Sequence, residues 1–186
     1  FINHATVLLQ WQGFAVLTDP VWSERASPVQ FSGPKRVRAP GIAIEQLPKI
    51  DLVLISHNHY DHLDVSTIKQ LENRFAPKFL VAFGDAKLMR SLGVKDVEEM
   101  DWWDCTEINP TTAVTYAPTQ HFSSRTLWDR NRSLWGSFMI QRAGKNIYFG
   151  GDAGYSKHYQ DIGQRLGATD LGFIPIGAYE PRWFMG

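Results

Sequence analysis

One segment decides the fold of this chain, and it reads His57-Asn58-His59-Tyr60-Asp61-His62. It directly follows residues 51–56 (DLVLIS), an apolar run that predicts a strand buried on both faces. His57 and His59 are two residues apart, so in extended backbone both imidazoles point to the same side. Rigid scaffolds present functional groups on loops at strand ends. The segment therefore predicts a polar site at the end of a core strand.

A turn after this strand can bring Asp61 and His62 back towards the first two histidines, which places four potential ligands within six residues. Neutral imidazole and carboxylate are the usual protein ligands of zinc and related divalent ions. A polar turn that is rich in histidine by chance is the alternative, but three of the six histidines of the chain fall in this segment. We therefore expect a metal site.

Two later positions supply further candidate ligands, because two ions need more ligands than one segment offers. His121 follows the predicted strand 113–118, and Asp152 follows the predicted strand 146–150 in a glycine-rich turn. The glycines let the backbone approach an ion closely and permit a sharp turn. Alone, an aspartate in such a turn is more often a turn residue. Beside the histidine segment, a carboxylate at Asp152 can bridge two ions.

The rest of the chain alternates strands and helices, which predicts a layered α/β arrangement. Residues 1–18 contain two short apolar runs around Gln12-Gly13 and predict a β-hairpin, and residues 19–41 predict a long loop. Asp64 is the expected N-cap of a helix over 65–75. The other predicted elements are helices over 42–47, 86–92 and 157–166, and strands over 78–83, 113–118, 133–142, 146–150 and 171–176.

Composition sets broad limits on function. Nineteen basic and 19 acidic residues give a formal net charge of zero, so no global field attracts nucleic acid, and no nucleic-acid partner is expected. The single cysteine, Cys105, excludes an internal disulfide and a zinc site built on cysteines, and it is expected to pack as a small residue. No apolar run is long enough to span a bilayer. We expect a cytoplasmic or membrane-peripheral location.

The order of these residues resembles the metallo-β-lactamase superfamily, and the resemblance covers essentially the whole chain. It implies that residues 1–186 form a single hydrolase domain of the α/β class, a four-layer αββα sandwich with a binuclear zinc site along one edge. By the pattern of that superfamily, one zinc ion is held by three histidines, the second by an Asp-His pair, and a later aspartate bridges the two. The implied ligands are His57, His59 and His121 for the first ion, Asp61 and His62 for the second, and Asp152 for the bridge.

Finer detail narrows the resemblance to one branch, the N-acyl-phosphatidylethanolamine-hydrolysing phospholipase D enzymes and their bacterial relatives. This branch implies a phosphodiesterase that acts on N-acyl-phosphatidylethanolamine-like lipids through a zinc-bound hydroxide. Asp61, Asp152 and Tyr60 are the expected catalytic residues. Tyr60 is a candidate donor to the substrate phosphate or, equally, a core residue. Peripheral contact with a membrane is expected with such a lipid. The segments that carry the likeness are 3–8, 18–23, 57–64, 133–138 and 174–183.

Two other functions stay open on the same residues. A binuclear site can also polarise a carbonyl, so a lactonase or another ester or thioester hydrolase that takes a small-molecule substrate is the first alternative. A domain that kept the fold without catalysis is the second. The sequence sets neither the oligomeric state nor the identity of the metal.

Some features depart from the ligand pattern of the superfamily, and some residues have an expected structural role instead. The superfamily's second ion takes one more histidine near the C-terminus, and no histidine follows His158, so the second site is expected to be short of a ligand. The chain begins at Phe1 inside an expected strand and stops without a capping signal, so we expect a fragment truncated at both ends. His4 is expected to be structural and His158 exposed, while Asp19 is expected to orient a ligand histidine or, equally, to form a turn.

Overall fold

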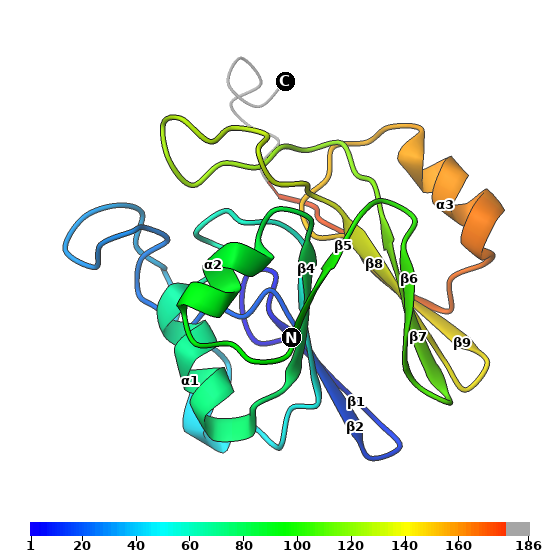
Figure 1. Ribbon diagram of the computed structural model, residues 1–186, viewed down its shortest axis with the longest axis horizontal. Helices are drawn as coiled ribbons and strands as arrows, with labels where there is room; N and C mark the ends of the chain where they lie inside the picture. The colour runs from blue at the N-terminus through cyan, green and yellow to red at the C-terminus, as the bar shows by residue number, and fades with distance from the viewer. Residues whose placement is uncertain (178–186) are drawn as a thin grey trace.

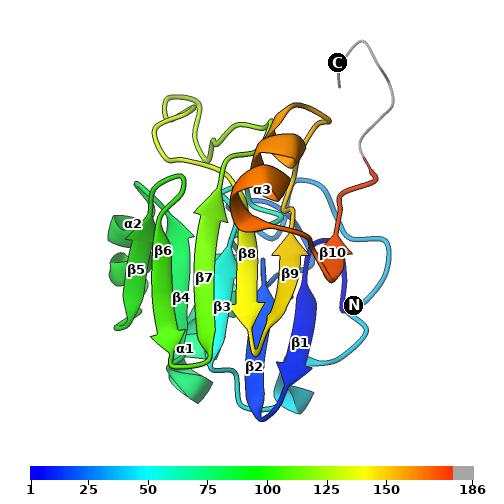
Figure 2. The same cartoon turned by 90° about the vertical axis from the view of Figure 1, so that its right-hand side faces the viewer.

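Two five-stranded β-sheets lie face to face in the computed structural model, which describes residues 1–177. Helices α1 (Val65–Phe75) and α2 (Ala86–Ser91) cover the outer face of one sheet, and α3 (His158–Leu166) covers the outer face of the other (Figure 1). Viewed from the α3 side, the second sheet lies in front of the first (Figure 2). The predicted α/β fold, an αββα sandwich, is confirmed.

The first sheet has the strand order β1-β2-β3-β4-β5. β1 and β2 form the predicted antiparallel hairpin, and β2, β3, β4 and β5 then run parallel to one another. Parallel strands end at the same edge of the sheet, so the segments that follow β2, β3 and β4 meet there. The strands are β1 (Val7–Trp11), β2 (Phe14–Thr18), β3 (Leu52–Ile55), β4 (Lys78–Ala82) and β5 (Val97–Met100).

The second sheet has the order β10-β9-β8-β7-β6. β7 and β9 are each antiparallel to β8, so they run in the same direction and end at the same edge. The residues after β7 and those after β9 therefore lie at one end of this sheet. The strands are β6 (Cys105–Asn109), β7 (Thr112–Ala117), β8 (Ser137–Arg142), β9 (Lys145–Phe149) and β10 (Leu171–Phe173).

Strand β3 is buried on both faces, as its apolar run predicts. Val53 and Ile55 join the core beneath α1 and α2, whereas Leu52 and Leu54 join the core between the two sheets. All four side chains are inaccessible to solvent, and each such burial contributes about 1.5–3 kcal/mol. The strand that carries the histidine segment is thus anchored at the centre of the sandwich.

Helix α1 begins where the sequence predicts. The side chain of Asp64 accepts a hydrogen bond from the backbone N–H of Ser66 and caps the first turn. Ile68 and Leu71, one helical turn apart, face the first sheet and are fully buried. Since the cap directly follows the histidine segment, the start of α1 limits how far that segment can move.

Other expectations differ in detail. The predicted helix over 42–47 is a 3-10 turn (Ile44–Gln46), and the strand predicted over 171–176 ends at Phe173. β5 and β6 were not predicted, because neither has the apolar alternation of a typical strand. No helix in residues 1–177 is long and apolar enough to cross a membrane. That residues 1–186 form a single domain stays a prediction.

Two expectations about burial were wrong. His158, at the start of α3, is 7% exposed rather than solvated, and its ring centre lies 4.1 Å from that of Tyr159. Cys105 is exposed rather than packed, because β6 is the outermost strand of its sheet. The segment 178–183, including Trp183, lies outside the described residues.

Candidate metal centre

Three segments that are far apart in the sequence meet at one edge of the sandwich. Residues 57–62 follow β3, His121 follows β7 and Asp152 follows β9. Nε2 of His121 lies 3.1 Å from Nε2 of His57, and the Oδ2 atom of Asp152 lies 3.3 Å from Nε2 of His62. The six residues that the sequence offered as ligands are therefore brought together from both sheets.

The histidine cluster consists of His57, His59 and His121. Nδ1 of His59 lies 2.8 Å from Nε2 of His57 and 3.2 Å from Nε2 of His121. Burial lowers the pKa of all three rings, and it outweighs the carboxylates of Asp61 and Asp152, which raise the pKa of His59 and His121; the pKa of His121 falls to about 4. The rings are therefore neutral near pH 7, which is the form that binds metal.

The mixed cluster consists of His4, Asp61 and His62. The Oδ2 atom of Asp61 lies 3.1 Å from Nε2 of His4 and 3.7 Å from Nε2 of His62. Burial alone would raise the pKa of Asp61, but the contact with His4 and the charge of His62 lower it well below its usual value. Asp61 is thus a carboxylate at neutral pH and can serve as a ligand.

Asp152 lies between the two clusters. Its Oδ2 atom is 3.3 Å from Nε2 of His62 and 3.8 Å from Nε2 of His121, so one carboxylate reaches a member of each cluster. Burial opposes ionisation, but His62 and His121 lower the pKa of Asp152 overall. The arrangement is compatible with the bridging role that the resemblance implies.

The donor atoms fit divalent ions such as zinc. With bonds of about 2.0–2.2 Å, two ligand atoms of a tetrahedral zinc site lie about 3.3–3.6 Å apart. The separations in the mixed cluster, 3.1–3.7 Å, span this range, and those in the histidine cluster, 2.8–3.2 Å, are slightly shorter than it. Each cluster offers three ligand atoms that lie close together. The residues present therefore fit two metal sites.

Asp19 orients one of the candidate ligands. This fully buried carboxylate follows β2, and its Oδ2 atom lies 2.6 Å from Nδ1 of His62. It also accepts hydrogen bonds from the backbone N–H and the hydroxyl of Ser56, directly before the histidine segment. Burial lowers the pKa of His62, but Asp19 and then Asp152 raise it well above its usual value. A carboxylate behind a histidine fixes its ring and directs Nε2 towards an ion.

Arg125 also holds the histidine segment in place. Its guanidinium donates to the backbone carbonyls of Asn58 and Leu63 at 2.7 and 2.9 Å. The hydroxyl of Tyr60 donates to the carbonyl of Arg125, and the guanidinium carbon lies 4.1 Å from the centre of the Tyr60 ring. In this arrangement the Tyr60 proton is used within the protein. Its donation to a substrate phosphate stays a prediction.

A buried carboxyl lies beneath the same segment. Oδ1 of Asp85 accepts hydrogen bonds from Asn58 at 3.1 Å and from the Ser133 hydroxyl at 2.7 Å. The Oδ2 atom of Asp85 is buried and has no hydrogen-bond partner within residues 1–177. Burial raises the pKa of Asp85 to about 6, against the opposing effect of the two hydrogen bonds.

This raised pKa predicts a pH-dependent stability. Folded Asp85 keeps its proton up to about pH 6, whereas the unfolded chain releases it near its usual pKa of 3.8, so stability falls as pH rises between these values. Relative to Asp85→Asn, the wild type should lose on the order of 2–3 kcal/mol of unfolding free energy from about pH 4 to pH 7. Urea unfolding at several pH values measures this. Asp161→Asn, in the exposed pair with Lys157, is the control. Parallel pH profiles for the wild type and Asp85→Asn would contradict the prediction.

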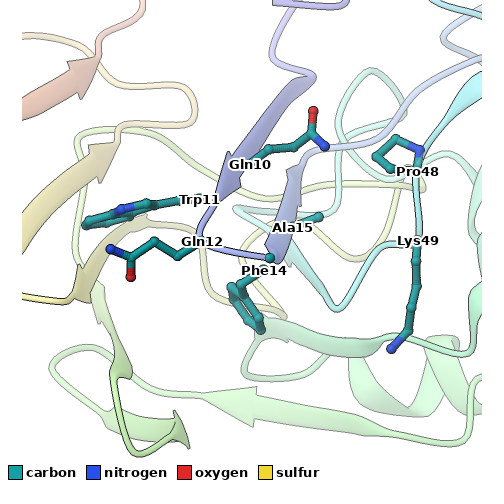
Figure 3. Close-up of a pocket in the computed structure, with 8 residues that line it drawn as sticks. Gln10, Trp11, Gln12, Phe14, Ala15, Pro48 and Lys49 are labelled. Carbon is teal, nitrogen blue, oxygen red and sulfur yellow. The ribbon is translucent and has the colours of Figure 1, made fainter.

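A separate hollow of about 350 Å³ lies beside the β1–β2 turn (Figure 3). The turn precedes β2, whereas Asp19 and the histidine segment follow the carboxyl ends of β2 and β3, so the hollow is at the other end of the sheet. It is not part of the metal centre. Its lining residues are Gln10, Trp11, Gln12, Gly13, Phe14, Ala15, Pro48 and Lys49.

Fold and site together define a protein with two packed β-sheets that carries the histidine cluster and the mixed cluster at one edge. A family model described as the Beta-lactamase superfamily domain matches residues 15–186. The chain belongs to this family.

Two curated relatives carry a more specific name. The chain is 40% identical over 195 residues to N-acyl-phosphatidylethanolamine-hydrolyzing phospholipase D 1 of Caenorhabditis elegans, which covers all of this chain and 55% of that protein. It is 35% identical to the mitochondrial N-acyl-phosphatidylethanolamine-hydrolyzing phospholipase D of Saccharomyces cerevisiae, over 93% of this chain and 38% of that protein. The chain thus spans about half the length, or less, of these relatives.

Solved structures show the same fold at lower identity. Igni18, a metallo hydrolase from Ignicoccus hospitalis, has a TM-score of 0.72 at 21% identity and covers 96% of this chain and 70% of its own. CmlA, a diiron β-hydroxylase from Streptomyces venezuelae, has a TM-score of 0.72 at 24% identity, over 99% of this chain and 36% of its own. At these identities the likeness shows the fold alone.

Sequence reasoning missed one candidate ligand, as well as Arg125 and Asp85, which contact the histidine segment. His4 was expected to be structural, but the structure places its ring against Asp61 and His62. The only local signal is its position in a short turn directly before β1, between Asn3 and Thr6. Nothing in that stretch alone shows what the ring contacts.

Proposed function

We propose that this chain carries the metal-binding catalytic part of a zinc-dependent phosphodiesterase of phospholipase D type, which acts on N-acyl-phosphatidylethanolamine-like lipids. The observation that carries the proposal is the position of Asp152, which reaches the histidine cluster and the mixed cluster with one carboxylate oxygen. Two adjacent divalent ions suit the in-line displacement at a phosphodiester. The names of the worm and yeast relatives support the substrate class.

The chemistry divides between the ions and the chain. Bound divalent ions would lower the pKa of water towards neutrality and neutralise charge that develops on a phosphoryl oxygen. Asp61, ionised at neutral pH, orients the attacking water and accepts a hydrogen bond from it. Asp19 and Arg125 hold the ligand segment rigidly, so the reacting groups need little rearrangement. The reaction breaks one P–O bond and adds water across it.

The surroundings of the histidine cluster suit a lipid with an anionic headgroup. The ring of Phe122 lies 4.7 Å from that of His59, and the guanidinium of Arg130 lies 4.7 Å from the Phe122 ring centre. Further along the same segment, Leu127 and Trp128 are 90% and 82% exposed. Apolar side chains can contact the acyl chains of a lipid, and a neighbouring cation can contact the phosphate of its headgroup. These contacts also support peripheral contact with a membrane surface.

The test is a substrate panel on the whole protein. We expect turnover of an N-acyl-phosphatidylethanolamine and of a model phosphodiester, loss of at least about 100-fold on chelation, and recovery on adding zinc. Metal analysis of the unchelated protein identifies the ion. No turnover of either phosphodiester with both sites filled would contradict the proposal. Hydrolysis of a lactone or thioester without phosphodiesterase activity would assign the site to carbonyl chemistry, and inactivity on the whole panel would assign a non-catalytic domain.

A further inference from the structure

We infer that His4 is a direct ligand of the second metal ion, together with Asp61 and His62. Nε2 of His4 lies 3.1 Å from Oδ2 of Asp61 and 3.3 Å from Nε2 of His62. Both separations are close to the edge of a tetrahedral zinc site, about 3.3–3.6 Å. The inference rests on the metal centre of the proposed function but is independent of the substrate.

The polar atoms around His62 favour a shared cation over hydrogen bonds. Nδ1 of His62 is engaged by Asp19, so only Nε2 faces the site. That nitrogen has three polar neighbours within 3.7 Å, on His4, Asp61 and Asp152. A single N–H can serve one of these contacts, whereas an ion at their centre is bound by several of them at once. The orientation of the two rings is compatible with a shared ion, since the His4 and His62 rings meet at 67° with their centres 4.9 Å apart.

The backbone around His4 is held in a strained turn that delivers this ring. His4 has a φ of +39°, a conformation that costs a non-glycine residue on the order of 1 kcal/mol. The turn is closed by the N–H of Thr6, which donates to the carbonyl of Asn3 at 2.6 Å. Strain of this kind persists only where surrounding contacts enforce it, and it concentrates at functional sites.

The same turn is fixed to the group that orients His62. The hydroxyl of Thr6 donates to the backbone carbonyl of Asp19 at 2.7 Å, and the side chain of Asn3 donates to the carbonyl of Val21 at 3.0 Å. Asp19 in turn holds the ring of His62. The two imidazoles of the mixed cluster are therefore positioned by one connected structure, as expected for two ligands of one ion.

Metal binding tests this inference without reference to activity. His4→Phe keeps a ring but removes both nitrogens, and we expect it to weaken the second zinc ion by about 100-fold or more while the first still binds. His4→Gln restores a hydrogen-bonding group to Asp61 without a good zinc ligand, and it should stay weak. Competition with a chelator measures both affinities, and thermal unfolding verifies the fold.

X-ray absorption of the zinc-saturated protein separates ligation from simple positioning. If His4 is a ligand, the variants show one zinc-bound imidazole fewer than the wild type at equal zinc content. An unchanged imidazole count, or full recovery of affinity in His4→Gln, would show that His4 only positions Asp61 and would overturn the inference. A wild type that binds one ion would overturn it as well. An inactive protein with two ions and the expected imidazole count would instead count against the proposed function alone.

Discussion

Asp152→Ala is expected to lower kcat/KM for the phosphodiester substrate by about 1,000-fold or more. The carboxylate approaches a member of each cluster, at 3.3 Å from His62 and 3.8 Å from His121. Its pKa is lowered, so its negative charge is present at neutral pH. Without it, two adjacent cations would lose the charge that offsets their repulsion.

Steady-state kinetics on a soluble phosphodiester measures this effect, with the metal content of each sample determined in parallel. Asp161→Ala is the matched control, since it removes a carboxylate from α3 that forms an ion pair with the exposed Lys157. The control should stay within about twofold of the wild type. If Asp152→Ala kept its metal and lost less than about tenfold in kcat/KM, the bridging role would be wrong.

Gly151→Ala is expected to destabilise the fold by about 3 kcal/mol, or roughly 10 °C in Tm. Gly151 has a φ of +57°, and an added Cβ would lie 2.6 Å from Cβ of Ser56 and 3.0 Å from the carbonyl oxygen of Gly136. Ser56 cannot move away, because it is fully buried and held by two hydrogen bonds from its own N–H and hydroxyl to Asp19. The clash therefore displaces either Asp152 or the strand end before His57.

Gly154→Ala is the matched control on the other side of Asp152. A Cβ there meets Gln120 at 3.5 Å, an ordinary contact, and the hydrogen bond from its N–H to the Gln120 carbonyl is unaffected. Its unfolding free energy should stay within about 1 kcal/mol of the wild type. Thermal unfolding followed by circular dichroism compares the two variants. Equal Tm values for both variants would contradict the prediction, because they would show that the fold tolerates a Cβ at residue 151.

Local patterns in the sequence predicted most of the fold because the signals act within a few residues. The apolar run before the histidine segment forms β3, and Asp64 caps α1 as expected. β5 and β6 escaped prediction because their residues, VEEM and CTEIN, are only partly apolar. β5 pairs with β4, and β6 pairs with β7. Their strand conformation comes from this pairing, which the pattern of apolar residues within each strand does not reveal.

Burial was harder to predict than secondary structure. The helix carrying His158 was expected, but which of its faces meets the second sheet depends on how α3 packs. Cys105 has a small side chain of the kind that is common in protein cores, yet it is exposed because it lies on an outermost strand. A side chain's exposure is set by the elements that pack against it, and these come from elsewhere in the chain.

The sequence by itself determined the donor types, their order and the strand that presents them. Spacing within residues 57–62 and the positions of His121 and Asp152 after strands identified six candidate ligands, because the carboxyl ends of strands carry such groups. Only the tertiary structure decided the place of His4, whose neighbours Asp61 and His62 lie 57 and 58 residues away. The physical reason is that its imidazole reaches the site through a strained turn tied to Asp19, a contact between segments that no local pattern encodes.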